Sequence, residues 1–264
     1  MTDIDKHPAG SFCWIELHTS DQNAAKSFYS SLFGWEAHDN PMGPNDFYTE
    51  FKLQGREAAA GCTLRPEERS HGVPPHWMIY ITVESADAAA TKAQQLGGKV
   101  LAPAFDVMDA GRMAIIQDPT GATFCAWQAK KSVGIRIAGV HGTLCWADLS
   151  TPDAKRAADF YSGMFGWQIE NQRTDGTKDP SGYEHIKNGE HFIGGIPPAA
   201  YRPPGAPAHW MAYLQVDDVD SCASKAKGLG AKLCLAPMTM EGVGRLAVIA
   251  DPQGAVFAIF KSAR

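Results

Sequence analysis

Short segments in which hydrophobic and polar residues alternate recur along this chain. In each group of such segments, the first is followed by a segment with helical spacing. Residues 13–18 are the first: one face carries Cys13, Ile15 and Leu17, and the other carries Trp14, Glu16 and His18. This alternation predicts a strand with two different faces. Apolar positions between residues 25 and 33 then recur at helical spacing, after a capping Ser20 or Asp21 and before Gly34. They predict a helix that ends at the glycine.

Strand-like runs follow at residues 47–53 and 58–64, and the pattern then restarts. The second part predicts a strand over 77–83, a helix over 85–96 stopped by Gly97-Gly98, and short strands near 99–101, 113–117 and 123–127. Asp118-Pro119-Thr120-Gly121 places proline and glycine where a tight turn needs them, so the last two strands should form a hairpin. The first half of the chain is therefore interpreted as two strand–helix–strand–strand–strand modules.

Nearly the same sequence pattern then occurs a second time, 132 or 133 residues later. Trp14 to Leu17 returns as Trp146 to Leu149, Phe28-Tyr29 as Phe160-Tyr161, Leu32 to Trp35 as Met164 to Trp167, His76 to Met78 as His209 to Met211, and Asp118 to Ala122 as Asp251 to Ala255. The period is too long for a solenoid repeat, so each copy should be a whole domain. We expect domains at 1–131 and 138–264, with 129–140 as the connector.

The alternation also assigns the two faces of each predicted sheet. The aliphatic sides of the strands at 77–83 and 210–216 should pack under helices. The opposite sides form inner, concave surfaces with aromatic walls and few polar groups, which is typical of a small-molecule pocket. The candidate ligand-binding residues there are Trp14, Met78, Tyr80, Cys125 and Trp127 in the first copy, and Trp146, Met211, Tyr213 and Phe260 in the second.

Several other side chains have two interpretations. Arg112 and Arg245 open strands beside the inferred cups and could bind an anionic ligand, or could simply pair with a nearby acid. Cys125 could be a nucleophile or a buried filler thiol; no base is evident next to it and its repeat partner is Ala258. The proline-rich segments 65–75 and 197–207 are either rims over the cups or plain module linkers.

Composition narrows the function classes. The chain has 264 residues, 44% of them hydrophobic, and a formal charge of −5, so it has no basic footprint for nucleic acid. No apolar run approaches the roughly 20 residues needed to cross a bilayer, and the N-terminus shows no signal peptide. The six cysteines form no CxxC pair, so the sequence does not favour a zinc finger or a disulfide framework. We therefore expect a cytoplasmic protein without nucleic-acid or membrane partners; its oligomeric state is not predicted.

The module order, the Phe-Tyr-x-x-Leu/Met-Phe-Gly-Trp helix ending, the Gly-Gly after the second helix and the Asp-Pro-x-Gly-Ala turn together resemble the vicinal oxygen chelate superfamily. This superfamily contains glyoxalases, extradiol dioxygenases and bleomycin-resistance proteins, and the resemblance covers about residues 10–260. It implies an α+β fold with two tandem domains. Each would be a cupped mixed sheet of paired βαβββ modules with helices outside.

The resemblance also implies where metal ligands would lie. The family's ligand positions fall on Trp14, Met78, Cys125, Trp146, Met211 and Ala258, with a fourth ligand region at 60–62 and 193–195. Tryptophan and alanine cannot coordinate a hard divalent cation, and methionine suits only soft metals. We therefore expect no metal at the usual site and no cofactor, with a divalent metal at a displaced site as the alternative.

One repeated residue pair is the candidate for acid–base chemistry. If the two modules are related by a local two-fold axis, Glu16 should face His76, and Asp148 should face His209 in the second copy. Such a carboxylate–imidazole pair could hold or transfer a proton, or could be a purely structural hydrogen bond.

The sequence thus predicts a protein that binds a small aromatic or partly polar molecule in one or two cups. A glyoxalase-like lyase or dioxygenase with a displaced metal site, built from Glu16 and His76 or from Asp148 and His209, is the enzymatic alternative. A drug- or toxin-sequestering protein is the third class. The differences at Cys125/Ala258, Glu16/Asp148 and Trp127/Phe260 indicate that the two cups are not equivalent.

Overall fold

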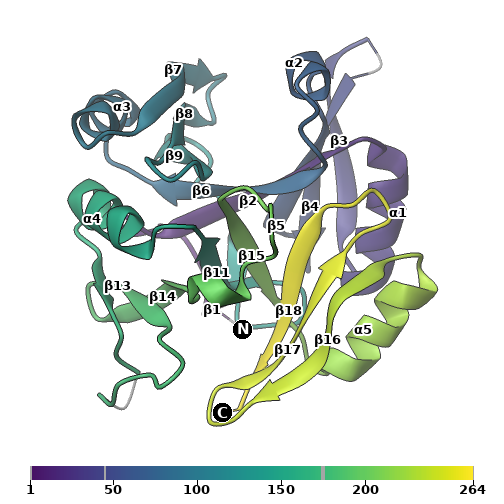
Figure 1. Cartoon of the computed structure of the whole chain (residues 1–264). Helices are drawn as coiled ribbons and strands as arrows, with labels where there is room; N and C mark the ends of the chain where they lie inside the picture. Colours follow the sequence, from purple (N-terminus) through teal and green to yellow (C-terminus); the bar gives the residue numbers. More distant parts are fainter. Residues whose placement is uncertain (1, 45, 174–175, 264) are drawn as a thin grey trace.

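The computed structural model describes residues 2–44, 46–173 and 176–263. Two eight-stranded sheets dominate it (Figure 1). The first contains, in spatial order, β3 (Glu36–Gly43), β4 (Asp46–Leu53), β5 (Arg56–Thr63), β2 (Phe12–Thr19), β6 (His76–Thr82), β9 (Thr123–Ala129), β8 (Gly111–Gln117) and β7 (Lys99–Val107). The second contains β12 (Gln168–Glu170), β13 (Glu184–Asn188), β14 (His191–Ile196), β11 (Leu144–Ser150), β15 (His209–Gln215), β18 (Val256–Ser262), β17 (Gly244–Ala250) and β16 (Lys232–Met240).

Helices accompany each sheet. They are α1 (Gln22–Phe33), α2 (Pro66–Ser70), α3 (Ala86–Gln95), α4 (Ala154–Phe165), α5 (Val219–Gly228) and the 3-10 turn η1 (Ala199–Tyr201). Asp21 is the residue that caps α1, where it accepts a hydrogen bond from the backbone of Ala24, and Gly34 ends the helix with φ +74°. No described helix is long and apolar enough to span a membrane.

The pairing within each sheet confirms the two predicted modules per copy. In the first sheet β2 and β6 pair antiparallel at the centre, β5 runs parallel to β2, and β9 runs parallel to β6. The second sheet repeats this order with β11, β15, β14 and β18. The α+β class and the tandem arrangement of two mixed sheets are therefore confirmed.

Some edge strands were not predicted. β3 is exposed along its whole length and contains Pro41, so it shows no alternation from which a strand could be recognised. β7 extends to Val107, well beyond the predicted 99–101, and two register shifts interrupt its pairing with β8. β3 has no buried face to produce an alternating pattern, and β7 alternates only between exposed and half-buried residues, so its signal is weak.

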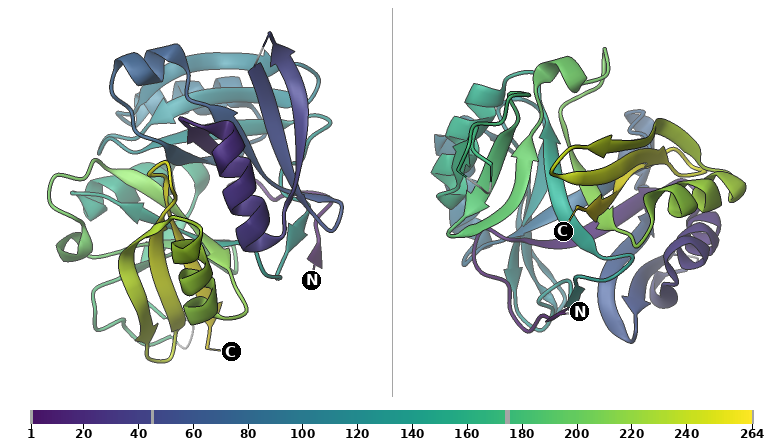
Figure 2. Two further views of the ribbon diagram at one scale, coloured as in Figure 1. Left: turned by 90° about the vertical axis from the view of Figure 1, so that its right-hand side faces the viewer. Right: turned by 90° about the horizontal axis from the view of Figure 1, so that it is seen from below.

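The aliphatic faces of the two sheets form one core that is shared by both copies. α1 lies against α5, and α3 lies against α4, as Figures 1 and 2 show from three sides. Aromatic rings interlock across this boundary: Phe124 lies 5.6 Å from Tyr161, and Tyr29 lies 5.7 Å from Phe257, between ring centroids. We call the opposite face of each sheet, which is turned away from this core, its cup face.

A reciprocal pair of tryptophans joins the copies. Trp35 Nε1 donates to the Gly142 carbonyl at 3.0 Å, and Trp167 Nε1 donates to the Gly10 carbonyl at 2.9 Å. Both glycines have left-handed φ values, +77° at Gly10 and +81° at Gly142. A side chain at either position would be strained and would crowd the other copy. Each copy thus docks the tryptophan after its first helix against the chain that leads into the other copy's first strand.

The connector covers the first cup face. Ile135 donates its backbone N–H to the Cys13 carbonyl at 2.7 Å, and Trp127 Nε1 donates to the Ser132 carbonyl at 3.0 Å. Ile135 and Trp127 belong to a cluster of buried residues on this face. β1 (Thr2–Asp3) pairs with β10 (Ile137–Ala138) and places Ile4 against that cluster. Cys13 also belongs to this cluster, contrary to the prediction that it shares a face with Ile15, because a register shift next to Cys13 breaks the alternation.

We expect Trp35→Phe and Trp167→Phe each to lower the free energy of unfolding by about 2 to 3 kcal/mol. Each substitution leaves a buried carbonyl without its donor and opens a small cavity in the shared core. Urea unfolding followed by circular dichroism measures the effect. Tyr201→Phe, on a side chain that is 69% exposed, is the control and should change stability by no more than about 0.5 kcal/mol. Unchanged stability in both tryptophan variants would contradict the role given to this contact.

Candidate functional site

Each cup face carries a buried carboxylate held between two tyrosines. In the second copy Asp148 accepts hydrogen bonds from the Tyr213 hydroxyl at 2.6 Å, from the Tyr183 hydroxyl, and from Trp146 Nε1 at 3.0 Å. In the first copy Glu16 takes the place of Asp148 and interacts with the hydroxyls of Tyr48 and Tyr80, and Trp14 Nε1 donates to Tyr48 at 3.0 Å. The strand pairing places these groups at equivalent positions in the two sheets.

Gly195 makes room for Tyr183. It lies beside Asp148 in the parallel pairing of β14 with β11, and a Cβ atom there would fall 2.1 Å from the Tyr183 hydroxyl. The corresponding residue of the first copy is Ala60, which lies beside Glu16. A glycine in this strand therefore serves a close approach of a side chain rather than an unusual backbone angle.

The two carboxyl groups differ in acidity. Burial raises the pKa of Asp148 to about 6, although the hydrogen bonds from Tyr183, Tyr213 and Trp146 oppose this shift. Burial also acts to raise the pKa of Glu16, but hydrogen bonding and the charge of His18 outweigh it, so that pKa lies below its ordinary value. Asp148 therefore exchanges its proton close to neutral pH, whereas Glu16 stays ionised.

His18 is the centre of a second polar group in the first copy. Its Nε2 lies 3.0 Å from Glu16 Oε1, its Nδ1 lies 3.0 Å from Glu68 Oε1, and its ring stacks on that of His76 with centroids 4.8 Å apart. Cys62 Sγ lies 3.8 Å from Glu16 Oε1. We call Glu16, His18, Cys62, Glu68 and His76 the His18 cluster. The residues come from β2, β5, α2 and β6.

Pairing between His18 and its two carboxylate neighbours determines the direction in which their pKa values shift. Burial acts to lower the pKa of His18, but hydrogen bonds to Cys62, Glu16 and Glu68 raise it well above its ordinary value. The pKa of Glu68 falls to about 2, because the hydrogen bond and charge of His18 outweigh burial. His18 is therefore an imidazolium between two carboxylates.

The predicted facing of Glu16 with His76 is wrong. The register places Glu16 opposite Met78 and His76 opposite His18, and Asp148 opposite Met211 with His209 opposite Ser150. Both histidines direct Nδ1 to a backbone carbonyl two residues earlier, at 2.9 Å. The prediction assumed that Trp14 would lie opposite Met78; the observed pairing of Trp14 with Tyr80 moves every partner by two residues.

The candidate ligand-binding residues of the two copies differ in exposure. Trp14, Met78, Tyr80, Cys125 and Trp127 are all buried in one cluster on the first cup face, under Ile135. On the second cup face Tyr213 is buried, but Trp146, Met211 and Phe260 are half-exposed. The predicted inequality of the cups is thus visible in their packing. In the first cup face Tyr48 is the half-buried ring beside Glu16, whereas in the second the half-exposed side chains include the indole that donates to Asp148.

The two arginines do not lie beside the cups. Arg112 Nε pairs with Asp87 Oδ2 at 2.7 Å, and Arg245 Nε pairs with Asp220 Oδ2 at 2.6 Å, in both cases with an aspartate in the first turn of a helix. Arg112 is two residues before Ala114, which belongs to the shared core, so alternation puts Arg112 on the helix side. Both guanidinium groups already have an anionic partner, and the interpretation as an ion pair is the correct one.

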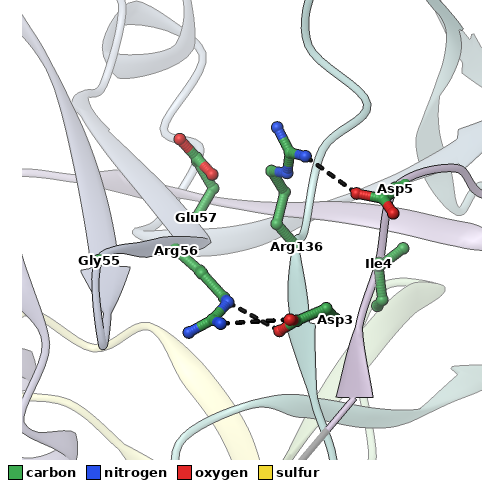
Figure 3. Close-up of a pocket in the computed structure, with 7 residues that line it drawn as sticks. All are labelled: Asp3, Ile4, Asp5, Gly55, Arg56, Glu57 and Arg136. Atoms are coloured by element: carbon green, nitrogen blue, oxygen red, sulfur yellow. Dashed lines mark hydrogen bonds and ion pairs between the residues drawn. The ribbon is translucent and has the colours of Figure 1, made fainter.

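Two surface hollows occur elsewhere. One of about 290 Å³ lies where the N-terminus and the connector meet β5 and is lined by Asp3, Ile4, Asp5, Gly55, Arg56, Glu57 and Arg136 (Figure 3). Its two arginines are paired with acids of the hollow, Arg56 with Asp3 at 2.7 Å and Arg136 with Asp5 at 3.2 Å, and Glu57 is paired with Lys52 outside it. The other, of about 600 Å³, lies at the start of α1 and is lined by Ser20, Asp21, Gln22, Asn23, Lys26, Asp39, Phe47 and Thr63.

The residues at the family's metal-ligand positions do not fit a metal. Trp14, Met78 and Cys125 pack together in the buried cluster of the first cup face, and burial raises the pKa of the Cys125 thiol well above its ordinary value. In the second copy Ala258, which has no donor atom in its side chain, lies beside Tyr213. An indole, thioethers and a protonated thiol do not make a site for a hard divalent cation.

The sequence does not identify Tyr48, Tyr183 and Glu68 as site residues, and it places Cys62 only within the fourth ligand region at 60–62 that the family resemblance implies. Tyr48 and Tyr183 are 135 residues apart, unlike the repeated motifs, because the segments after the first helix differ in length between the copies. Glu68 lies in the proline-rich segment that was interpreted as a rim or a linker. His18 could have been found, since the alternation already placed it on the same face as Glu16.

Known proteins are similar to this chain in sequence. A model of the Glyoxalase/Bleomycin resistance protein/Dioxygenase superfamily matches residues 11–126 and 143–259. The "Putative glyoxylase CFP32" of Mycobacterium tuberculosis is 41% identical over 253 residues, covering 95% of this chain and 94% of that protein. The "Anthracycline biosynthesis protein DauV" of Streptomyces sp. (strain C5) is 30% identical over 262 residues, covering 95% and 92%.

A solved structure also resembles the fold. The Mn(II)-bound glyoxalase from Novosphingobium aromaticivorans superposes with a TM-score of 0.66 at 17% sequence identity, covering 96% of this chain and 82% of that one. The twofold family match fits the two sheets and the four modules. This chain belongs to the Glyoxalase/Bleomycin resistance protein/Dioxygenase superfamily.

Proposed function

We propose that this protein binds a flat aromatic molecule against the cup face of the second copy and that Asp148 exchanges a proton with it. The observation that carries the proposal is the environment of Asp148, a buried carboxyl whose pKa is raised to about 6, held by two tyrosine hydroxyls and an indole below half-exposed aromatic side chains. A titrating acid beside an apolar surface is the usual combination at a binding or catalytic site.

The apolar surface supports the choice of ligand. Trp146, Met211 and Phe260 are the half-exposed residues, and rings and thioethers favour flat partners, with a stacked ring contributing about 1 kcal/mol beyond the area that it buries. One relative is named for anthracycline biosynthesis. The aromatic part of the first cup face is filled by its own side chains and by the connector, so we assign no aromatic ligand to it.

The chemistry expected of Asp148 is general acid–base catalysis. An aspartic acid with a pKa of about 6 is partly protonated near neutral pH, where both proton uptake and proton donation are effective. The hydroxyls of Tyr183 and Tyr213 orient the two carboxyl oxygens. Their hydrogen bonds stabilise the ionised carboxylate in its apolar surroundings. Carbonyl and phenol groups of an aromatic ligand are suitable proton-transfer partners, and this scheme requires no metal.

Two other functions compete with this proposal. If the ligand is only bound and never converted, the protein is a sequestering member of the family. The second competing function is that of a metal-dependent lyase or dioxygenase. Two observations support it: one relative is named as a glyoxylase, and the His18 cluster offers nitrogen, oxygen and sulfur donors. Product analysis after incubation with a bound ligand distinguishes sequestration from conversion of the ligand. A glyoxalase assay on protein with and without added metal tests the metal-dependent function.

We expect Trp146→Ala to weaken the binding of planar aromatics at least about tenfold, since stacking and buried area are lost together. Compounds with two to four fused rings would be screened by thermal shift, and dissociation constants of the best would be measured by calorimetry. Trp14→Phe, at the repeat-related position under the connector, is the matched control and should bind as the wild type does. Equal affinity in folded Trp146→Ala protein would remove the second cup face as the site.

A pH series tests the state of Asp148. Its pKa is about 6 in the folded protein and about 4 in the unfolded chain, so between these values the native state binds more protons. The free energy of unfolding should therefore fall as pH rises from about 4 to about 6, by up to about 3 kcal/mol from this group, and stay level above. Asp148→Asn should lack this contribution in urea unfolding at several pH values. An identical pH dependence in both proteins would show that Asp148 does not titrate there.

Gly195→Ala tests the tyrosine contact without touching the carboxyl group. The added Cβ would force the Tyr183 hydroxyl away from its place beside Asp148. The ionised carboxylate then loses a donor, so the pKa of Asp148 should rise above about 6. Carbon-13 NMR titration of labelled aspartate measures it directly, with Gly228→Ala, where a Cβ meets no atom within 4 Å, as the control. A pKa that is unchanged or lower would contradict the role of Tyr183.

A further inference from the structure

We propose that the His18 cluster is a binding site for one transition-metal dication of the zinc, cobalt or nickel class, with Glu16, His18 and Cys62 as its ligands. One ligand atom from each residue lies within 4.8 Å of the other two, and the closest pair, Glu16 Oε1 and His18 Nε2, is 3.0 Å apart. Ligands of a tetrahedral zinc ion are about 3.3 to 3.8 Å apart, so small side-chain rotations suffice to admit an ion.

The backbone fixes this set of donors. Glu16 and His18 are two residues apart on β2 and therefore share the cup face, and Cys62 lies beside His18 in the parallel pairing with β5. Glu16 and His18 are each only 5% exposed, whereas Cys62 is half-buried, which leaves a route for an ion. All three side chains come from neighbouring positions of a central, rigid part of the sheet.

Glu68 completes the arrangement from outside the ligand set. It accepts from His18 Nδ1 at 3.0 Å, which leaves Nε2 as the ligand atom. Glu68 is itself fixed, because its Oε2 accepts from the Arg65 backbone at 2.8 Å at the start of α2. A histidine that ligates a metal through one ring nitrogen usually donates its other N–H to a carboxylate, and here that partner is already in place.

Charge and donor type select the metal. When the ion binds, it displaces the Nε2 proton of His18 and the thiol proton of Cys62, so that one carboxylate and one thiolate neutralise the dication. Oxygen, nitrogen and sulfur together suit zinc and its neighbours rather than magnesium or calcium. Three protein ligands leave at least one coordination position for water or another small ligand.

The second copy lacks this set. Ser150 lies opposite His209 where His18 lies opposite His76, and Pro197 takes the place of Cys62 by register. Within residues 2–44, 46–173 and 176–263, two groups of three potential metal ligands lie close together, and both belong to the His18 cluster of the first copy. The expected stoichiometry is therefore one ion per chain. The site lies on the other sheet from Asp148 and does not depend on the ligand proposed there.

Titration of chelator-stripped, full-length protein with Co²⁺ alone tests the site. We expect saturation at one ion per chain, tetrahedral visible bands, and a sulfur-to-cobalt charge-transfer band in the near ultraviolet that Zn²⁺ abolishes by competition. Cys62→Ser should remove the charge-transfer band and weaken binding at least about tenfold. Cys145→Ser, at a half-buried thiol of the second copy, should change neither.

Two further variants keep the outcome decisive. Glu68→Gln should preserve the charge-transfer band but weaken binding by about 10- to 100-fold, as expected of a positioning residue. His76→Ala tests the neighbouring group of His18, Glu68 and His76. Absence of Co²⁺ binding would overturn the proposal. So would binding that survives Cys62→Ser with its spectrum intact, or binding that His76→Ala abolishes while Cys62→Ser does not.

Discussion

The shared core between the two copies sets the geometry of everything else in this molecule. Because the aliphatic faces of both sheets meet helices and rings of the other copy, neither sheet can expose its aliphatic side to solvent. Trp35 and Trp167 fix this arrangement from both ends, and the Tyr29 hydroxyl adds a buried hydrogen bond to Asp251 at 2.9 Å. The two cup faces are therefore the faces left over, and they are free to differ.

The two cup faces differ first in what covers them. The connector places Ile135 over the first cup face and the N-terminal segment adds Ile4, so Trp14 and Trp127 are core residues. Where a cup is filled in this way, its aromatic side chains contribute packing rather than recognition. The equivalent Trp146 keeps its hydrogen bond to the buried carboxylate while part of its ring stays accessible.

How much the sequence predicts depends on whether a signal is local. Alternation and helical spacing identified the modules, the caps at Asp21 and Gly34, and the faces of β6 and β15, because each of these follows from neighbouring residues. The pairing of Glu16 failed because it required the register between two strands 60 residues apart, which a bulge next to Cys13 and the position of the local axis decide. Neither feature leaves a pattern in the chain.

The same reasoning explains why the repeat was a good guide to the fold and a poor one to the site. Residues that pack in the shared core are bound by the same constraint in both copies, so Trp77 and Trp210 keep equivalent hydrogen bonds to Tyr29 and Tyr161. Residues around the carboxylates face no such constraint. With His18 as partner Glu16 remains charged, whereas Ser150 leaves Asp148 with only neutral donors, and burial then raises its pKa. The residue two positions after the carboxylate on the same strand, His18 in one copy and Ser150 in the other, is thus one of the differences that separate an ion pair from a titrating acid within one fold.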